Sequence, residues 1–457
     1  MFVDNVNPTA IETGLRLWED GTSVHPIEVE RHIQSISACL KKYQVDDFVL
    51  IQIEGFVAFI SAVLVLEQSG IGYGLLDPTF TENEKASAIK ICPAPILKFE
   101  SKGYSVDESK SDSGWIRNNR ARLMSSNVYF TSGTTGTVKA VIRSKKKCKI
   151  ESSAIKEMYD LHAGESIALK TPFWHAYGFG MAVMPALQFG LALHYSKINS
   201  PRTVYEEVVT YHPKLFLAVP SQYEIYGLKS FNMENNQTQF IASGGPLSSR
   251  VVERFRKNWG RTIRNQYGST ETGPISITGL DDGDKGTIGT TYGGVSIELE
   301  SYLSSNQTLT VRSPWLFDGY LPSSPEYVIC EEPVLLYEMP DLGKSDRQGN
   351  IILVGRKDTI VNLHGKKVSI QKIVDVVSEF QGVQDARVCL QNEEGSDFLV
   401  AYVVSEIEIK QSSIFEHCQE RLAPYEIPSD IVFLDEFPKN KMGKVTVTNL
   451  RTVKGRL

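Results

Sequence analysis

Two short segments of this sequence gather the residue types that bind phosphate groups and nucleotides. The first, residues 129–139 (YFTSGTTGTVK), contains five Ser/Thr hydroxyls, two glycines and a final lysine. Hydroxyls and backbone N–H groups can surround a polyphosphate, and glycine lets the backbone come close to it. The distance from Gly133 to Lys139 does not fit the GxxxxGK[ST] pattern of Walker loops. We therefore predict a phosphate-binding loop of a different kind, with an ordinary Ser/Thr/Gly turn as the alternative.

The second segment, residues 265–271 (NQYGSTE), places an amide, an aromatic ring, hydroxyls and a carboxylate within seven residues of one another, after an apolar strand. An amide can read the edge of a base, and a carboxylate suits Mg²⁺. Taken singly, Tyr267 could be a core residue and Glu271 a solvated surface charge. Together these residues match the needs of a nucleotide.

Composition excludes some partners for these loops. The 457 residues carry a formal net charge of -6 and a sequence pI near 5.9, so no global basic surface exists to neutralise nucleic acid. Six scattered cysteines without a CxxC pair indicate thiols in a reducing compartment, and the N-terminus has no secretory pattern, so we expect a cytoplasmic protein. The most apolar run, Phe56–Leu66, is shorter than the ~20 residues of a membrane span and predicts a buried helix.

The elements that must position the two loops are those of an α/β fold. Up to about residue 355, short apolar runs alternate with helix-length amphipathic segments, as in a layered α/β domain. Binding loops of such sheets follow the ends of the strands. The predicted strands are Val128–Thr131, Ser166–Leu169, Lys214–Val219, Gln239–Ala242 and Thr262–Asn265.

The last 100 or so residues have a different pattern of predicted helices and strands. A helix-strand-strand-helix pattern covers Ser369–Phe380, Ala386–Gln391, Phe398–Val404 and Ser412–Leu422. We predict a large N-terminal α/β domain of several subdomains, residues 1–356, and a small C-terminal α+β domain, residues 357–457, joined by a hinge.

The motifs of this chain resemble those of the adenylate-forming superfamily, which contains acyl- and aryl-CoA synthetases, luciferases and peptide-synthetase adenylation domains. TSGTTGTVKAV resembles its phosphate loop, NQYGSTETG its adenine and magnesium loop, and ASGGPL (242–247) its substrate-adenine loop. Leu75–Pro78 fits an early family motif. Similarity continues, in the family's order, through Tyr337–Gly343, Gly355–Gly365 and Pro438–Lys444.

The resemblance implies ATP and Mg²⁺ as cofactors. Asn265 would bond the adenine amine, Tyr267 would pack on the ring, Thr270 would touch the α-phosphate and Glu271 would hold Mg²⁺. Asp341 and Arg356 would bracket the ribose; without the resemblance, they could be a turn aspartate and a surface ion-pair residue. The nucleotide residues implied in the phosphate loop are Thr131, Ser132, Gly133, Thr134, Thr135, Gly136 and Lys139, and those beside the acid and adenine are Gly244 and Gly245.

The resemblance also implies a catalytic lysine and two half-reactions. Spacing in Pro438–Lys444 (PKNKMGK) matches the family's lysine loop and indicates Lys444, although a cationic run near a chain end is more often a solvated tail. A carboxylate that attacks phosphorus meets another anion, so a positioned ammonium would stabilise the charge. Asp358 matches the hinge, and Gly365 and Lys366 would line the path of the thiol, from coenzyme A or the phosphopantetheine of an acyl or peptidyl carrier protein.

The acid substrate is indicated by residues 171–180 (TPFWHAYGFG). Amino-acid-activating relatives place an aspartate here for the substrate's ammonium, but this chain has Ala176. His175 and Tyr177 resemble the pair that flanks the carboxylate in aryl-acid and acyl-CoA ligases; otherwise, they are core residues. We therefore expect an aromatic or short hydrophobic acid.

Some positions depart from the family's pattern and leave alternatives open. Val138 and Ala140 replace a common proline and glycine, Met339–Pro340 stand where Thr-Gly is usual, and the large domain is short. The alternatives are an amino-acid adenylation enzyme that loads a carrier protein and a degenerate nucleotide-binding regulator. Lys145–Lys147 and Lys149 could dock CoA phosphates or an acidic carrier, although a solvated lysine face is the simpler interpretation.

Overall fold

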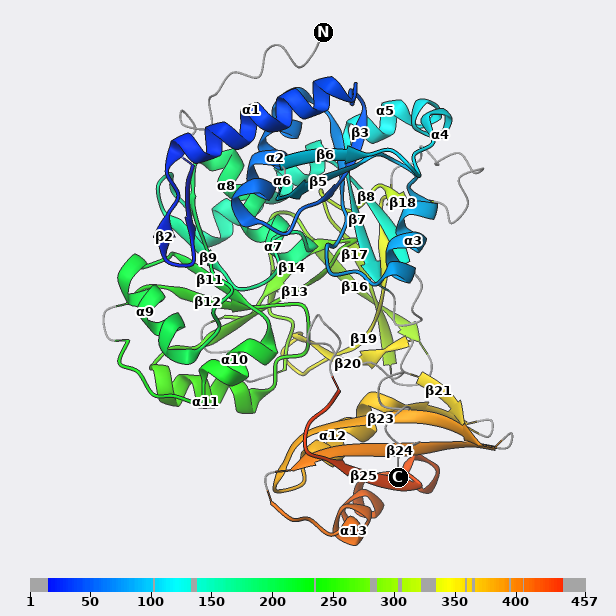
Figure 1. Cartoon of the computed structure of the whole chain (residues 1–457). Coiled ribbons are helices and arrows are strands. Elements are labelled where there is room, and N and C mark those ends of the chain that lie inside the picture. The colour runs from blue at the N-terminus through cyan, green and yellow to red at the C-terminus, as the bar shows by residue number, and fades with distance from the viewer. Residues whose placement is uncertain are drawn as a thin grey trace. The chain divides into compact units, whose positions relative to one another are not determined.

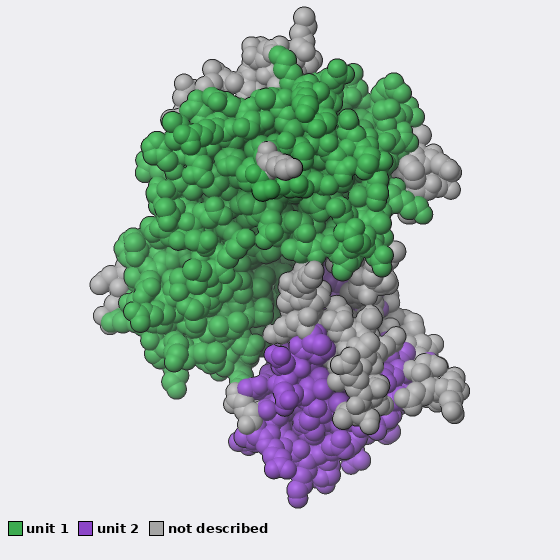
Figure 2. Space-filling model, viewed as in Figure 1, with its two compact units in different colours: residues 1–298, 310–337 green, residues 299–309, 338–457 purple. Residues whose placement is uncertain are grey.

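The computed structural model forms two compact units. It describes residues 15–101, 103–132, 138–233, 236–279, 286–302, 306–321, 334–357, 360–363, 366–393, 396–405 and 407–438. Unit 1 comprises residues 1–298 and 310–337, and unit 2 comprises residues 299–309 and 338–457 (Figure 2). The predicted domain boundary after residue 356 lies within unit 2. The predicted boundary is a hinge about which one part would move, whereas the units are defined by their compactness, so the boundary stays a prediction.

Unit 1 contains two large sheets (Figure 1). In the seven-stranded sheet, the inner pairs β3–β4, β3–β5 and β4–β7 are parallel. Its order is β18-β8-β7-β4-β3-β5-β6, with bounds β3 (Phe48–Gln52), β4 (Gly72–Leu75), β5 (Ile96–Glu100), β6 (Gly103–Asp107), β7 (Ser126–Ser132), β8 (Val138–Ser144) and β18 (Gly319–Tyr320).

The second sheet has nine strands, and consecutive strands from β1 through β10, β9, β11 and β12 to β13 are parallel. Its order is β15-β14-β13-β12-β11-β9-β10-β1-β2, with bounds β1 (Arg16–Glu19), β2 (Thr22–Ser23), β9 (Ser166–Leu169), β10 (Ala192–Tyr195), β11 (Leu215–Ala218), β12 (Gln239–Ala242), β13 (Ile263–Ser269), β14 (Gly273–Ile277) and β15 (Thr290–Thr291).

A layer of helices joins the two sheets through one apolar core. Helix α2 (Phe56–Ser69) is buried on all sides from Phe56 to Leu66, as the apolar run predicts. Alternate strand residues face this core from both sheets, for example Val49 and Ile51 in β3 and Ile167 and Leu169 in β9. Because both sheets share this core, the carboxyl ends of their strands have fixed positions relative to one another.

The outer face of each sheet packs on further helices. Phe48 and Leu50 of β3 pack in a second core with α3 (Glu82–Ile91), α4 (Ser113–Asn118) and α5 (Arg120–Met124). Phe216 and Phe240 pack in a third core with α9 (Pro201–Tyr211), α10 (Pro220–Tyr226) and α11 (Ser249–Trp259). The remaining helices of unit 1 are α1 (Pro26–Lys42), α6 (Lys145–Tyr159), α7 (Ala176–Gly178), a π-helix (Phe179–Val183) and α8 (Met184–Phe189).

Unit 2 shows the predicted helix-strand-strand-helix order. One face of the sheet β23-β24-β25 packs on α12 (Ile370–Ser378) and α13 (Gln411–Arg421). A third strand that the sequence pattern did not predict, β25 (Asp430–Leu434), pairs in parallel with β24. The other strands that lie wholly in unit 2 are β20 (Ile351–Arg356), β21 (Ile360–Leu363), β22 (Lys366–Ser369), β23 (Val383–Glu393) and β24 (Ser396–Ser405), whereas β16 (Ser296–Tyr302), β17 (Asn306–Arg312) and β19 (Tyr337–Ser345) lie only partly in it.

The predicted α/β class is confirmed, with a large N-terminal α/β unit and a small C-terminal unit. Strands β9 and β12 match the predicted strands residue for residue. Among the described helices, none combines the length and apolar content that a bilayer crossing requires.

A buried ion pair in unit 1 generates a stability prediction. The side chains of Arg143 in β8 and Glu151 in α6 are 2% and 3% exposed and form an ion pair, and Arg143 also donates to the Trp315 carbonyl over 3.0 Å. Glu151→Ala leaves a buried guanidinium without its carboxylate, so we expect the free energy of unfolding to fall by about 3–5 kcal/mol. Chemical denaturation measures this loss.

The matched control is Glu54→Ala, which removes an exposed partner of Lys197. Exposed pairs contribute little because water screens them, so this variant should unfold almost like the parent. An equal loss of unfolding free energy in the two variants would contradict a larger contribution of the buried pair to stability.

Candidate functional site

The predicted phosphate loop is the connection of a β-hairpin. Thr131 and Lys139 are directly opposite each other in the antiparallel pair β7–β8, and Ser132 is opposite Val138. The loop residues between these strands, including Gly133, Thr134, Thr135 and Gly136, lie outside the described residues. The hairpin therefore holds Thr131 and the exposed Lys139 side by side where the loop begins and ends.

Tyr320 joins two predicted site residues that come from different sheets. The Lys139 Nζ atom lies 5.6 Å from the centroid of the Tyr320 ring, within cation–π range. The Tyr320 hydroxyl donates to the Glu271 carboxylate over 2.8 Å. The hydroxyls of Tyr320 and Tyr337 lie 3.4 Å apart. The structure thus brings Lys139 and Glu271 to one aromatic side chain, at a surface where Tyr320 remains 36% exposed.

Tyr320 is not among the site residues predicted from the sequence. Its position depends on β18, which pairs with β8 and places Tyr320 opposite Val141, two residues from Lys139. Burial first, and then the adjacent Glu271 carboxylate, raise the pKa of Tyr320 well above its usual range. The phenol therefore stays neutral and remains a hydrogen-bond donor to Glu271 at physiological pH.

The predicted nucleotide loop is in large part a strand, which corrects the sequence interpretation. Strand β13 extends to Ser269 because β14 pairs with it in antiparallel register, so Asn265 and Tyr267 lie in the strand and only Thr270 and Glu271 lie in the turn. Alternation along β13 places Asn265 and Tyr267 on one face and Gln266 on the other. The Gln266 amide is buried and bonded to Tyr159, Tyr292 and the Ser276 carbonyl.

The segment predicted to bind the acid, residues 171–180, follows β9 and extends into the π-helix. His175 is the N-cap residue of α7, and Ala176 and Tyr177 pack partly buried against the core that joins the sheets. The Tyr177 hydroxyl donates to the Ile241 carbonyl in β12 over 3.0 Å. A Cβ atom at Gly178 would lie 2.5 Å from the Pro172 carbonyl oxygen, so this tight turn requires glycine.

His175 meets a carboxylate from the other sheet. Its Nε2 atom lies 3.3 Å from Oδ2 of Asp77, just beyond the end of β4. The side chain of Asp77 is 4% exposed, whereas that of His175 is 27% exposed. The early motif Leu75–Pro78 and the acid segment are therefore in contact.

The predicted Gly244 and Gly245 are exposed and follow β12, three and four residues after Ile241. Gly244 has a φ of +84°, in the left-handed region that glycine adopts most readily. Since Tyr177 bonds to the Ile241 carbonyl, β12 connects the acid segment with this glycine turn.

The remaining predicted residues belong to unit 2. Asp341 and Arg356 are direct partners in the antiparallel pair β19–β20, so the structure places these two side by side. The Lys366 Nζ atom lies 5.9 Å from the centroid of the Tyr425 ring. Three residues lie outside the described part of the chain: Asp358, the predicted hinge; Gly365, predicted for the thiol path; and Lys444, the predicted catalytic lysine.

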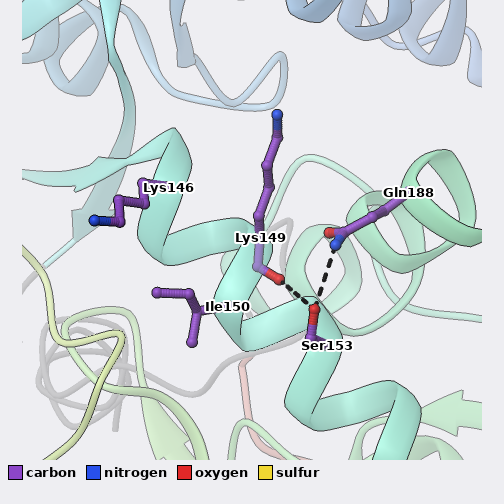
Figure 3. A pocket seen from close by; sticks show the side chains of 5 residues that line it. All are labelled: Lys146, Lys149, Ile150, Ser153 and Gln188. Atoms are coloured by element: carbon purple, nitrogen blue, oxygen red, sulfur yellow. Dashed lines mark hydrogen bonds between the residues drawn. The ribbon is translucent and has the colours of Figure 1, made fainter.

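The lysine cluster at the start of α6 is divided by its contacts. Lys145 donates to the Ile71 carbonyl over 2.8 Å, and Lys147 pairs with Asp318. Lys146 and Lys149 instead line an open hollow, which contains no predicted site residue (Figure 3). The hollow is completed by Ile150, Ser153 and Gln188.

Comparison with known proteins identifies the family. A sequence model of the AMP-binding enzyme matches residues 124–321, and a model of the AMP-binding enzyme C-terminal domain matches residues 372–444. The chain belongs to the AMP-binding enzyme family. The matched residues of this AMP-binding enzyme include both predicted nucleotide segments and end at Lys444.

Its relatives include ligases and synthetases. A probable CoA ligase of Humulus lupulus is 24% identical over 71% of this chain, and the delta-poly-L-ornithine synthetase of Acinetobacter baumannii (strain AB307-0294) is 27% identical over 70%. The chain spans 60% of the length of the first relative and 25% of the second.

A solved structure establishes the same fold over nearly the whole chain. The o-succinylbenzoate CoA synthetase of Bacillus subtilis, in complex with its acyl-adenylate intermediate, has a TM-score of 0.78 at 17% identity. The match covers 95% of this chain and 94% of the synthetase.

Proposed function

We propose that this AMP-binding enzyme is an AMP-forming acid–thiol ligase. It would activate a carboxylic acid with ATP to give acyl-AMP and pyrophosphate, and then transfer the acyl group to the thiol of coenzyme A or of a carrier protein. The observation that carries the proposal is the convergence of Lys139 and Glu271 on Tyr320 beside the Ser/Thr/Gly connection of β7 and β8. A cation, a carboxylate and a hydroxyl-rich loop at one place suit Mg²⁺-bound ATP.

The phosphates of ATP would lie against Thr131, Ser132 and Lys139, with Gly133 to Gly136 supplying backbone N–H groups. Glu271 is partly exposed and offers the hard oxygen ligand that Mg²⁺ prefers. Bound Mg²⁺ would neutralise phosphate charge. The Tyr320 hydroxyl would hold the carboxylate of Glu271 in place.

The nucleoside would be held by the residues that the family resemblance assigns to it. Asn265 and Tyr267 share one face of β13 and would read and pack on the adenine, with Thr270 at the α-phosphate. Gly244 and Gly245 would lie between the adenine and the acid. Asp341 and Arg356 are directly opposite each other in the β19–β20 pair, which supports a joint role at the ribose hydroxyls.

Lys444 would be the catalytic lysine. The C-terminal-domain model ends at this residue, which supports the assignment. As the acid's carboxylate approaches the α-phosphate, a nearby ammonium would stabilise charge that water would otherwise screen. With a reference pKa of about 10.4, a lysine is charged at neutral pH and needs no proton transfer for this role.

The acid would bind beside His175, Ala176 and Tyr177. We infer an aromatic or short hydrophobic acid, because Ala176 supplies no counter-charge for an ammonium. The acyl-adenylate in the related o-succinylbenzoate synthetase supports an acid with an aromatic ring.

For the second half-reaction, Asp358 would act as the hinge, and Gly365 and Lys366 would line the thiol's path. The similarity to a CoA ligase supports coenzyme A as acceptor, with a carrier protein as the second candidate. The buried thiols of Cys39, Cys92, Cys148 and Cys418 support a reducing, cytoplasmic location.

One observation favours a second function. The similarity to delta-poly-L-ornithine synthetase supports an amino-acid adenylation enzyme. The two functions are separated by the acid that the enzyme activates, and a regulator that only binds nucleotide would activate none.

The first prediction concerns the substrate. In ATP–pyrophosphate exchange over a panel of aryl, short acyl, fatty and amino acids, we expect exchange with aryl or short acyl acids and at most weak exchange with amino acids. Preferred exchange with an amino acid would establish the second function, and no exchange with any acid would establish the regulator.

The second prediction concerns Lys444. Lys444→Ala should slow adenylate formation about 10²-fold or more, the scale for removal of one preorganised stabilising group. Thioester formation from supplied acyl-adenylate should be largely spared. The matched control, Lys441→Ala, removes a neighbouring charge and should leave exchange near the parent rate; normal exchange in Lys444→Ala would exclude the assigned role.

The third prediction concerns Tyr320. Tyr320→Phe keeps the ring beside Lys139 but removes the hydroxyl that donates to Glu271, so the KM for Mg²⁺–ATP should rise about tenfold, the scale of one hydrogen bond to a charged group. The KM for the acid should change little. Tyr205→Phe, which removes a hydroxyl bonded to the Asn232 carbonyl, is the control. An unchanged KM for Mg²⁺–ATP in Tyr320→Phe would refute this role.

A further inference from the structure

We propose that Asp77 is a positioning residue for His175: it orients the imidazole through Nε2 and thereby prepares Nδ1 to bind the carboxylate of the acid substrate. This inference rests on the proposed function, since it deepens the role of the acid segment. Asp77 would not touch the acid; it would act through His175.

The Asp77 carboxylate is held rigidly by its own turn. Its Oδ1 atom accepts hydrogen bonds from the backbone N–H and from the hydroxyl of Thr79, both over 2.7 Å. The Phe80 N–H donates to the Asp77 carbonyl over 3.2 Å and closes the turn. One carboxylate oxygen is thus fixed from within the β4–α3 connection, which also fixes the direction of the other.

The second oxygen, Oδ2, is buried and accepts no hydrogen bond from the described residues, yet it lies 3.3 Å from His175 Nε2. Burial of a carboxylate without compensation is costly. His175 is the residue that provides this compensation as an ion pair when its ring is protonated. A small rotation of the imidazole would convert the contact into a charge-assisted hydrogen bond.

The second ring nitrogen of His175, Nδ1, is the atom proposed to bind the substrate's carboxylate. A carboxylate beside Nε2 favours the form with a proton on Nε2, and a protonated ring carries a proton on Nδ1 as well. A charged Nδ1–H is a strong donor to a carboxylate. His175 is also the more exposed partner, which suits a side chain that meets a ligand.

A further observation in the same segment indicates a polar ligand. Trp174 is only 7% exposed. Its Nε1 atom is buried and has no hydrogen-bond partner among the described residues. The rings of Trp174 and His175 are 6.3 Å apart. Buried donors are rarely left without a partner in proteins, so an acceptor such as a carboxylate or an ordered water is expected here.

The rival explanation is that Asp77 itself binds an ammonium group of an amino-acid substrate. Asp77 would then act without His175, and its effect would persist when His175 is removed. The two explanations therefore differ in how the effects of the two residues combine.

The experiment uses full-length Asp77→Asn, His175→Gln and the double variant, assayed by ATP–pyrophosphate exchange with the best acid of the panel. Asp77→Asn keeps the shape and the bonds from Thr79, so we expect the KM for the acid to rise about tenfold, the scale on which one hydrogen bond loses its charge assistance. The KM for ATP should stay unchanged. In the His175→Gln background, Asp77→Asn should add less than twofold.

A tenfold effect of Asp77→Asn that persists in the His175→Gln background would overturn the proposal in favour of direct substrate binding. An unchanged KM for the acid in Asp77→Asn would overturn it as well. Thr79→Val provides a second variant, because it removes one bond to Oδ1 and leaves the charge; a rise of two- to threefold in the KM for the acid is expected, and no rise would count against the rigid turn.

An activity-independent measurement separates this inference from the proposed function. In the ¹⁵N-histidine-labelled full chain, the ring signals of His175 are those absent from His175→Gln. They should show a protonated Nε2 in the parent and lose this preference in Asp77→Asn. Unchanged signals in Asp77→Asn would overturn the pairing, whether or not the protein adenylates any acid.

Discussion

The arrangement of the site depends on the apolar core that the two sheets of unit 1 share. Residues 56–66 of α2 are buried on every side because each sheet presents alternate side chains to this layer. A polar substitution there would leave an unpaired group between the sheets. The same core fixes the ends of β4 and β9 relative to each other, and therefore the distance between Asp77 and His175.

Electrostatics then decides what the joined loops can hold. Lys139, Tyr320 and Glu271 combine a cation, a neutral phenol and a carboxylate, so the group is formally neutral. A polyphosphate would add several negative charges, and Lys139 alone cannot balance them. Further cations would therefore be required. The two proposed cations are Mg²⁺ bound to Glu271 and the ammonium of Lys444. Charge balance is thus the reason why the proposed reaction would need a metal and a further lysine.

Local patterns in the sequence predict the elements well where an apolar run has clear ends. Strands β9 and β12 and the helix–strand order of unit 2 follow from such runs. The extension of β13 to Ser269 does not, because its glycine and polar residues are held by pairing with β14. Tyr320 was not predictable either, since its position arises from a distant pairing of β18 with β8. The roles of Asn265, Asp341 and Lys444 come from resemblance and remain proposals.

The pair of Asp77 and His175 also bears on which acids the site would accept. In the proposed pair, Asp77 and a protonated His175 together carry no net charge, and Ala176 adds none. An amino acid would then bring its ammonium close to the protonated ring and find its potential counter-ion, Asp77, already engaged. Desolvation of an ammonium without a counter-ion is costly, whereas an aryl or acyl chain has no charge to desolvate. The proposed pair therefore favours a substrate whose only charged group is the carboxylate that would attack the phosphate.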